Sequence, residues 1–138
     1  MPEPAIDGRL KANYEDFYQS RNIAEWRRLG AIDKTANILK LCRDVPHDTV
    51  LEIGAGNGAI LENLSAKGFA KEFRALDVSS SGVDQIRSKN IPGLVEAATF
   101  DGYRTPYADD QFDLVILSHV VEHVEHPRLL LYEAARVG

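Results

Sequence analysis

The stretch that decides the fold is Val50–Gly58, which reads V-L-E-I-G-A-G-N-G and joins a short apolar run to a turn rich in glycine. The apolar run is typical of a parallel strand that is buried on both faces. The glycines allow backbone angles that a Cβ would block, and they let a ligand approach main-chain N–H groups closely. A helix expected over residues 59–67 would point the positive end of its dipole at this turn. The stretch therefore predicts a strand, a turn that holds a nucleotide-like ligand, and a helix.

Three further strands are expected at the intervals of a repeating strand-helix unit. They are Phe73–Asp77, Val95–Asp101 and Phe112–Ser118, and the first two end in an acid. Residue types that end or begin helices stand between and after them, namely Gly68, a serine among Ser79–Ser81, and Pro127. Strands that alternate with helices predict an open parallel sheet, with the ligand at the carboxyl ends of the strands.

Together these elements resemble a class I S-adenosylmethionine-dependent methyltransferase of the small-molecule (type 11) kind. The resemblance covers residues 49–137. It rests on E-x-G-x-G-x-G, on Asp77, on Asp101 with Pro106 after it, and on F-D-L-V-I-L-S-H-V-V-E-H-V from Phe112 to Val124. It implies a doubly wound α/β fold of the Rossmann-like type, with strands 1 to 4 in the order 3-2-1-4 and helices N-terminal to them. It also implies S-adenosylmethionine as cofactor and methyl transfer to a small-molecule acceptor.

The family has a seven-stranded sheet, whereas only strands 1 to 4 can be placed in these 138 residues. Three more strands with their connections would need roughly 60 to 90 residues, at about 30 or more for each strand-helix-strand unit. We therefore expect a mobile N-terminus at 1–12, a helical cap at 13–46 and a cofactor-binding half-domain at 47–138 that lacks the C-terminal strands. An uncovered fourth strand would present an apolar edge at which a second copy can pair as a homodimer.

The resemblance also implies a role for each residue of the cofactor site. Glu52 would attract the cofactor's ammonium group, and the glycines would lie against its methionine and ribose portions. Asp77 would accept hydrogen bonds from the ribose hydroxyls, and Asp101 from the adenine amino group. Ser118 and His119 would border the sulfonium and the substrate. The expected cofactor site is Glu52, Gly54, Ala55, Gly56, Gly58, Asp77, Val78, Ser79, Asp101, Gly102, Ser118 and His119.

Catalysis on such a site depends mainly on alignment, because the sulfonium already makes the methyl group electrophilic. Holding an acceptor in line can contribute ~7–11 kcal/mol. The remaining task is to remove the acceptor's proton. His119 and His123 are the candidate bases, since imidazole exchanges protons near neutral pH and both follow the fourth strand.

Two other interpretations use the same residues. Gly54–Ala59 also fits the G-x-G-x-x-A form of a dinucleotide fingerprint, and Asp77 follows at about the right interval for an NAD site. His119–His123 matches H-x-x-E-H, a zinc-protease motif that requires both histidines on one helix. We rank both below the methyltransferase interpretation and expect no metal, because the histidine segment directly follows a buried strand. A non-catalytic cofactor-binding module that needs a partner is a further alternative.

The aromatic residues near the N-terminus allow two interpretations. Tyr14, Phe17, Tyr18 and Trp26 either cover the sheet or form a lid that excludes water during methyl transfer. Arg27 is a candidate partner for the cofactor's carboxylate.

Composition limits the remaining classes of function. With 16 Lys and Arg against 21 Asp and Glu, the net charge is −5, which argues against a nucleic-acid partner. The sequence has no apolar run near the ~20 residues of a membrane helix and no signal peptide, so we expect no membrane partner. The single cysteine, Cys42, cannot form an internal disulfide, and the cytoplasm is the expected location.

Overall fold

The protein is built on one parallel sheet. The computed structural model describes residues 5–9, 11, 12 and 21–138. Its strands are β1 (Thr49–Ile53), β2 (Glu72–Asp77), β3 (Leu94–Thr99) and β4 (Leu114–Leu117). They pair in parallel in the order β3-β2-β1-β4, which confirms the predicted order 3-2-1-4. Tyr14, Phe17 and Tyr18, which were expected either to cover the sheet or to form a lid, lie outside the described residues.

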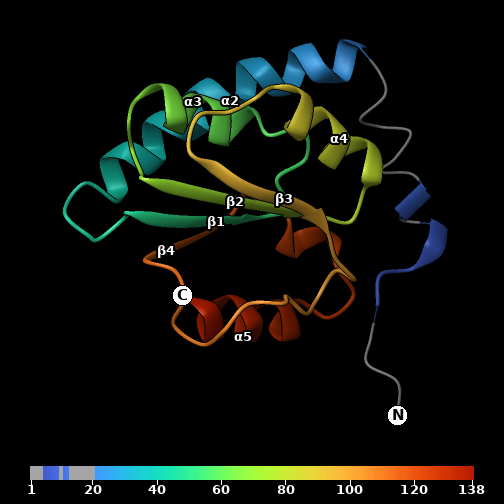
Figure 1. The fold of residues 1–138 in the computed structure, drawn as a ribbon. Coiled ribbons are helices and arrows are strands. Elements are labelled where there is room, and N and C mark those ends of the chain that lie inside the picture. The colour runs from blue at the N-terminus through green and yellow to red at the C-terminus, as the bar shows by residue number, and fades with distance from the viewer. Residues whose placement is uncertain (1–4, 10, 13–20) are drawn as a thin grey trace.

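Helices cover both faces of the sheet. The helices α2 (Arg21–Leu41), α3 (Ala59–Ala66) and α4 (Ser80–Ser88) lie on one face, and α5 (Pro127–Val137) lies on the other (Figure 1). A short 3-10 helix, η1 (Val121–His123), precedes α5. The layered arrangement is that of a Rossmann-like fold, as the alternation of strands and helices predicted.

The central strand β1 contributes to two hydrophobic clusters. Val50 packs with residues of α2, α3 and α4 on one face, while Leu51 and Ile53 pack with Leu130 and other residues of α5 on the opposite face. All of these side chains are buried. Because each such side chain contributes about 1.5–3 kcal/mol when it is fully buried, the two clusters fix the position of β1 and of the turn that follows it.

The ends of the helices match the residue types that the sequence supplies there. The hydroxyl of Ser79 caps α4 by accepting a hydrogen bond from the Gly82 N–H at 3.1 Å. Gly68 takes a left-handed φ of 64° after α3, and Pro127 is the first residue of α5. These three predictions are confirmed.

Two strands are shorter than predicted. The third ends at Thr99 instead of Asp101, and the fourth ends at Leu117 instead of Ser118. The chain leaves the extended conformation soon afterwards, since Gly102 has φ 100° and His119 has φ 56°. The acid Asp101 and the polar residue Ser118 therefore lie on turns beyond the strands, where their backbones approach the end of the sheet.

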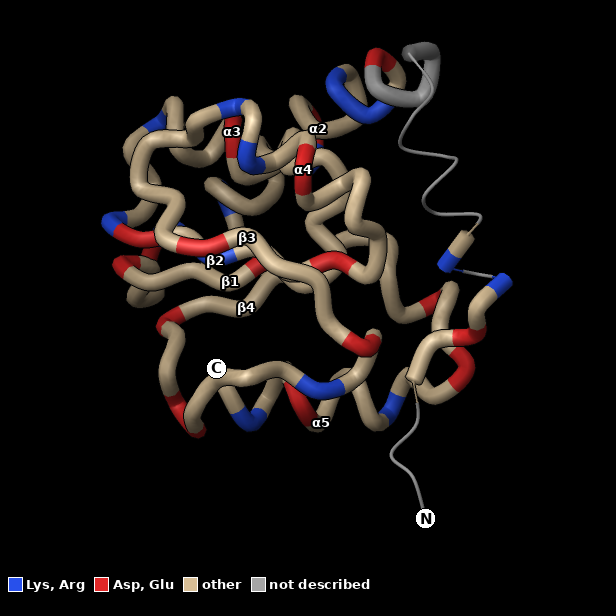
Figure 2. The backbone as a smooth tube through the Cα atoms, turned by 45° about the vertical axis from the view of Figure 1, so that its right-hand side comes forward, with Lys and Arg blue, Asp and Glu red and all other residues tan. Residues whose placement is uncertain are grey.

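Charged residues of both signs are interspersed along the described part of the chain (Figure 2). Among the described residues, we find no helix with both the length and the apolar character needed to cross a bilayer.

Candidate functional site

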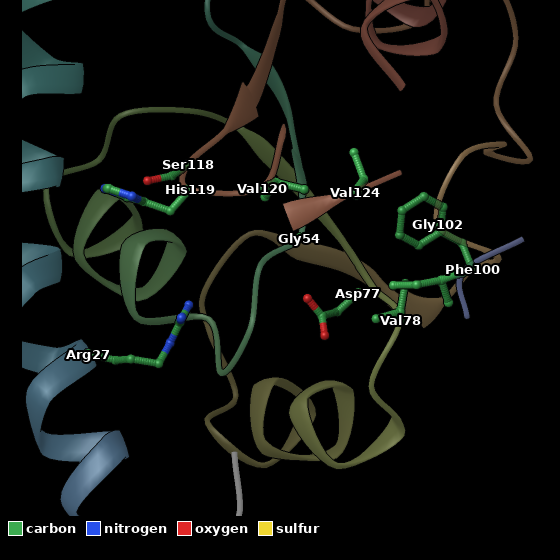
Figure 3. Close-up of a pocket in the computed structure, with 11 residues that line it drawn as sticks. Arg27, Gly54, Asp77, Val78, Phe100, Gly102, Ser118, His119, Val120 and Val124 are labelled. Carbon is green, nitrogen blue, oxygen red and sulfur yellow. The ribbon is translucent and has the colours of Figure 1, made fainter. Parts of the chain in front are cut away.

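A pocket opens at the carboxyl ends of the strands, where the sequence predicted a ligand. It encloses about 500 Å³ of empty space, counting the part that is open to solvent. Figure 3 shows Asp77 from the tip of β2 and Arg27 from α2 pointing toward the same space. The lining residues are Ile6, Arg27, Gly54, Asp77, Val78, Phe100, Gly102, Ser118, His119, Val120 and Val124.

The structure brings six of the twelve predicted cofactor-site residues into the lining of this pocket. They are Gly54, Asp77, Val78, Gly102, Ser118 and His119. The other six are not part of the lining: Glu52, Ala55, Gly56, Gly58, Ser79 and Asp101. The predicted set therefore divides into six residues that line the pocket and six that do not.

The glycine turn between β1 and α3 is held against β2. The N–H groups of Gly54 and Ala55 both donate to the Leu76 carbonyl, at 2.7 and 3.0 Å. Gly54 and Gly58 have left-handed φ values of 76° and 82°. A Cβ on Gly54 would overlap Val120, and a Cβ on Gly58 would lie 2.9 Å from Cγ1 of Ile86. Glycine is needed at both positions because the backbone angle and the close packing each exclude a side chain.

Asp77 connects this turn to the start of α4. Its carboxylate is buried and accepts hydrogen bonds from the Gly56 N–H and the Ser79 N–H, each at 3.1 Å. These contacts explain why Gly56 and Ser79 lie next to the site without lining it. A carboxylate fixed in this way at the tip of the second strand can also accept hydrogen bonds from hydroxyl groups in the pocket.

Glu52 is a buried acid beneath the pocket. Only 1% of its surface is exposed, and its Oε1 atom has no hydrogen-bond partner among the described residues. Burial raises the pKa of Glu52 to about 8. The positive charge of Arg27 opposes this rise, whereas the negative charge of Asp77 adds to it. The positive charge of Lys34 opposes the rise as well. A buried oxygen without a partner is costly, so the Oε1 atom of Glu52 is suited to accept a hydrogen bond from a donor group of a ligand.

Asp101 precedes Gly102, which lines the pocket from the loop after β3. The Asp101 Oδ1 atom accepts hydrogen bonds from the Tyr103 and Arg104 N–H groups, at 2.9 and 2.8 Å. The Asp101 carbonyl accepts from the Ile6 N–H at 2.9 Å. Asp101 thus shapes the loop after β3, whereas Gly102 faces the pocket itself.

The segment after β4 carries the candidate bases. Nδ1 of His119 lies 3.2 Å from Oε1 of Glu122, and Nε2 of His123 lies 3.7 Å from the same oxygen. Only His119 of the two histidines lines the pocket. The pKa of Glu122 is lowered, first by a hydrogen bond to its own backbone and then by the neighbouring histidines.

The same segment does not form the regular helix that the zinc motif requires. His119 has a left-handed φ of 56°, and only Val121–His123 form a turn of 3-10 helix. Within residues 5–9, 11, 12 and 21–138, no group of three or more His, Cys, Asp or Glu side chains is arranged to hold a metal ion.

Four pocket residues were not given a role from the sequence, namely Ile6, Phe100, Val120 and Val124. Phe100 precedes Asp101 in the sequence. Its position beside a predicted site residue at the end of a strand could have indicated that it lines the pocket. Val120 and Val124 lie within the motif Phe112–Val124, from which only polar residues were assigned to the site. Ile6 is far from the motifs, so only the tertiary structure brings it to the pocket. Trp26, for which a lid was one of two interpretations, is exposed and does not line the pocket.

Comparison with known proteins agrees with this geometry. Residues 51–138 match the family described as a methyltransferase domain. The Bacillus subtilis protein YrhH is 32% identical over 93 residues, which are 66% of this chain and 52% of YrhH. The mitochondrial ubiquinone biosynthesis O-methyltransferase of Candida albicans is 25% identical over 92 residues, which are 64% of this chain and 28% of the relative.

A solved structure of a SAM-dependent methyltransferase from Aquifex aeolicus shares the fold. Its TM-score is 0.64 at 22% identity, over 75% of this chain and 57% of that protein. The chain spans about half the length of YrhH and of the Aquifex protein, and less of the Candida enzyme. The family match, which covers more than half of the chain, identifies it as a member of the class I S-adenosylmethionine-dependent methyltransferases, whose cofactor is S-adenosylmethionine.

Proposed function

We propose that this chain binds S-adenosylmethionine for the methylation of a small-molecule acceptor. The observation that carries the proposal is the pocket, which brings Gly54, Asp77 and His119 together at one end of the sheet. When bound, S-adenosylmethionine supplies an electrophilic methyl group. The residues of the chain then have three tasks, which are to hold the cofactor, to shield it from water and to accept a proton from the acceptor.

The nucleoside end of the cofactor is assigned to the tips of β2 and β3. Asp77 would accept hydrogen bonds from the ribose hydroxyls, because its carboxylate is buried, fixed and part of the lining. Val78 and Phe100 offer apolar contacts to adenine, and Gly102 leaves room for the ring. Asp101 would accept from the adenine amino group through its second carboxylate oxygen, since Oδ1 already serves the loop.

The methionine end is assigned to the glycine turn and to α2. Glu52 would receive the ammonium group directly or through water, which would satisfy its buried Oε1 atom. Arg27 lines the pocket from α2 and would face the cofactor's carboxylate. Ala55, Gly56, Gly58 and Ser79 are proposed to position these groups from behind, by the hydrogen bonds and tight packing of the turn.

His119 is the proposed base and His123 the weaker candidate. His119 lines the pocket with Ser118, whereas His123 stands on η1 outside the lining. Glu122 lies between the two rings, and its contact with Nδ1 of His119 favours the tautomer that leaves Nε2 to accept a proton. This arrangement fits an acceptor that loses a proton when it is methylated, such as a hydroxyl group.

A small-molecule acceptor is favoured over a nucleic acid by the net charge of −5 and the interspersed charges. The Candida relative is named for ubiquinone biosynthesis, which is small-molecule chemistry. The single cysteine, Cys42, is a free thiol and fits a reducing compartment such as the cytoplasm.

An alternative is a module that binds the cofactor without turnover until a partner completes the sheet. In the described sheet β4 pairs only with β1, and three of its four residues are half-buried. A second copy could therefore pair along the outer edge of β4. In this scheme residues 13–46 act as the cap and residues 47–138 as the cofactor-binding unit. Sedimentation analysis of the chain with and without cofactor would measure such pairing.

The test of the proposed function is a calorimetric titration of the chain with S-adenosylmethionine and, in parallel, with NAD. We expect saturable binding of S-adenosylmethionine with a dissociation constant in the micromolar range, and no binding of NAD at the same concentrations. Binding of NAD without binding of S-adenosylmethionine would overturn the proposal.

A further inference from the structure

Ile6 takes part in the pocket although it lies far from the strand tips in the sequence. Its backbone N–H donates a 2.9 Å hydrogen bond to the Asp101 carbonyl, on the loop after β3. Its side chain is half-buried and lines the pocket together with Val78 and Gly102. The described segment 5–9 is thus attached to the end of the pocket that is formed by β2 and β3.

Gly102 makes this approach possible. It has φ 100°, and a Cβ at this position would lie 3.2 Å from the Cβ of Ile6 and 3.6 Å from Cγ1 of Val78. A side chain on residue 102 would therefore fill the space that Ile6 and Val78 share. The glycine serves the packing of Ile6 as well as the shape of the loop.

The side chains at this end of the pocket are suited to a purine. Val78 and Phe100 are apolar, as is Ile6, and they line the pocket together with Gly102, which has no side chain to cover its backbone groups. A purine ring has apolar faces and a polar edge, so it gains from apolar side chains on its faces and from backbone groups at its edge.

We propose that Ile6 is an additional adenine-binding residue, so that the N-terminal segment forms part of the cofactor site. The proposal rests on the proposed function, because it requires that the pocket takes a purine nucleoside. If Ile6 contacts the adenine, nucleoside binding and the docking of segment 5–9 must stabilise each other by the same factor.

The first test compares Ile6→Ala with the wild type in calorimetric titrations with adenosine and with S-adenosylmethionine. We expect Ile6→Ala to weaken the binding of both ligands by a similar factor of about ten, because apolar contact is lost only at the shared adenine. The matched control is Ile32→Ala, since Ile32 is exposed on α2 and lies outside the pocket. The control should stay within about twofold of the wild type for both ligands.

The second test measures hydrogen exchange at the Ile6 amide, which donates to Asp101. Saturating adenosine should slow this exchange by about the same factor by which Ile6→Ala weakens adenosine binding. Circular dichroism of Ile6→Ala would show that the fold is retained.

The outcomes separate the two proposals. Adenosine binding that is equal in the wild type and Ile6→Ala, with unchanged exchange at the Ile6 amide, would overturn the role of Ile6 alone. If the wild type binds neither adenosine nor S-adenosylmethionine, the proposed function and the role of Ile6 fail together.

Discussion

The two ends of the pocket differ in how firmly the chain holds them. At the nucleoside end, Asp77 and Val78 are buried, and the Asp77 carboxylate accepts two backbone hydrogen bonds. At the reaction end, the side chains of His119 and His123 are 68% and 55% exposed and share one carboxylate on Glu122. The first end is fixed by the core of the sheet, while the second stands on a short turn that projects from it.

Under the proposed function, this difference corresponds to the two kinds of ligand that the pocket would take. A site held by buried backbone hydrogen bonds is preorganised for one ligand of fixed shape, which suits a cofactor that the whole family shares. Exposed side chains on a turn can rearrange at little cost, which suits an acceptor that differs from one member to another. The comparison predicts large effects on stability and cofactor binding from changes at the fixed end, and small ones from changes at the exposed end.

The largest effect is expected for Glu52→Gln, measured as the free energy of unfolding against pH. Because the folded-state pKa of Glu52 is raised to about 8, the native protein keeps a proton that the unfolded chain releases near its ordinary pKa of 4.5. The stability of the wild type should therefore fall between about pH 5 and 8, and this loss should be absent in the variant. The difference between the two should grow with pH by up to about 1.4 kcal/mol per unit.

Urea unfolding of both proteins at several pH values would measure this difference, and Glu62→Gln on the outer side of α3 is a matched control. Equal pH dependence in the wild type and Glu52→Gln would show that Glu52 is ionised in the folded protein.

A smaller but still substantial effect is expected for Asp77→Ala, measured by calorimetric titration with S-adenosylmethionine. The variant loses the proposed hydrogen bonds to the ribose and the hydrogen bond that orients the Gly56 N–H. We expect binding to weaken about a hundredfold, or ~3 kcal/mol, the range for hydrogen bonds to a charged group. Asp84→Ala on α4 is the control, since its side chain is exposed. Unchanged affinity in Asp77→Ala would exclude the ribose role.

The smallest effect on cofactor binding is expected for His119→Ala. The His119 side chain is largely exposed, so its removal should change the affinity for S-adenosylmethionine by less than about threefold. Once an acceptor is identified, the same variant should lower the rate of methyl transfer much more than His123→Ala does. A loss of cofactor affinity as large as that of Asp77→Ala would remove the distinction between the two ends of the pocket.

The sequence was informative where residue type and backbone geometry coincide. The apolar run of β1, the glycines after it and the carboxylate of Asp77 each have a physical reason to stand where they do. The strand order was implied by the family resemblance that these residues carry. Glu52 was identified as a site residue, but its burial and the lack of a partner for its Oε1 atom depend on the tertiary structure, which no local sequence pattern describes. Ile6 could not be predicted, because its contact with Gly102 joins segments that are far apart in the sequence.

The measurement that tests the central claim most directly is a nuclear magnetic resonance titration of the backbone amides with adenosine and then with S-adenosylmethionine. Adenosine should shift the amides of Val78 and Gly102, at the nucleoside end. S-adenosylmethionine should shift these and also Gly54 and His119, which line the rest of the pocket. Shifts confined to the groove between α2, α3 and α4, which includes Arg28 and Gln85, would contradict the account, because they would place the ligand outside the pocket.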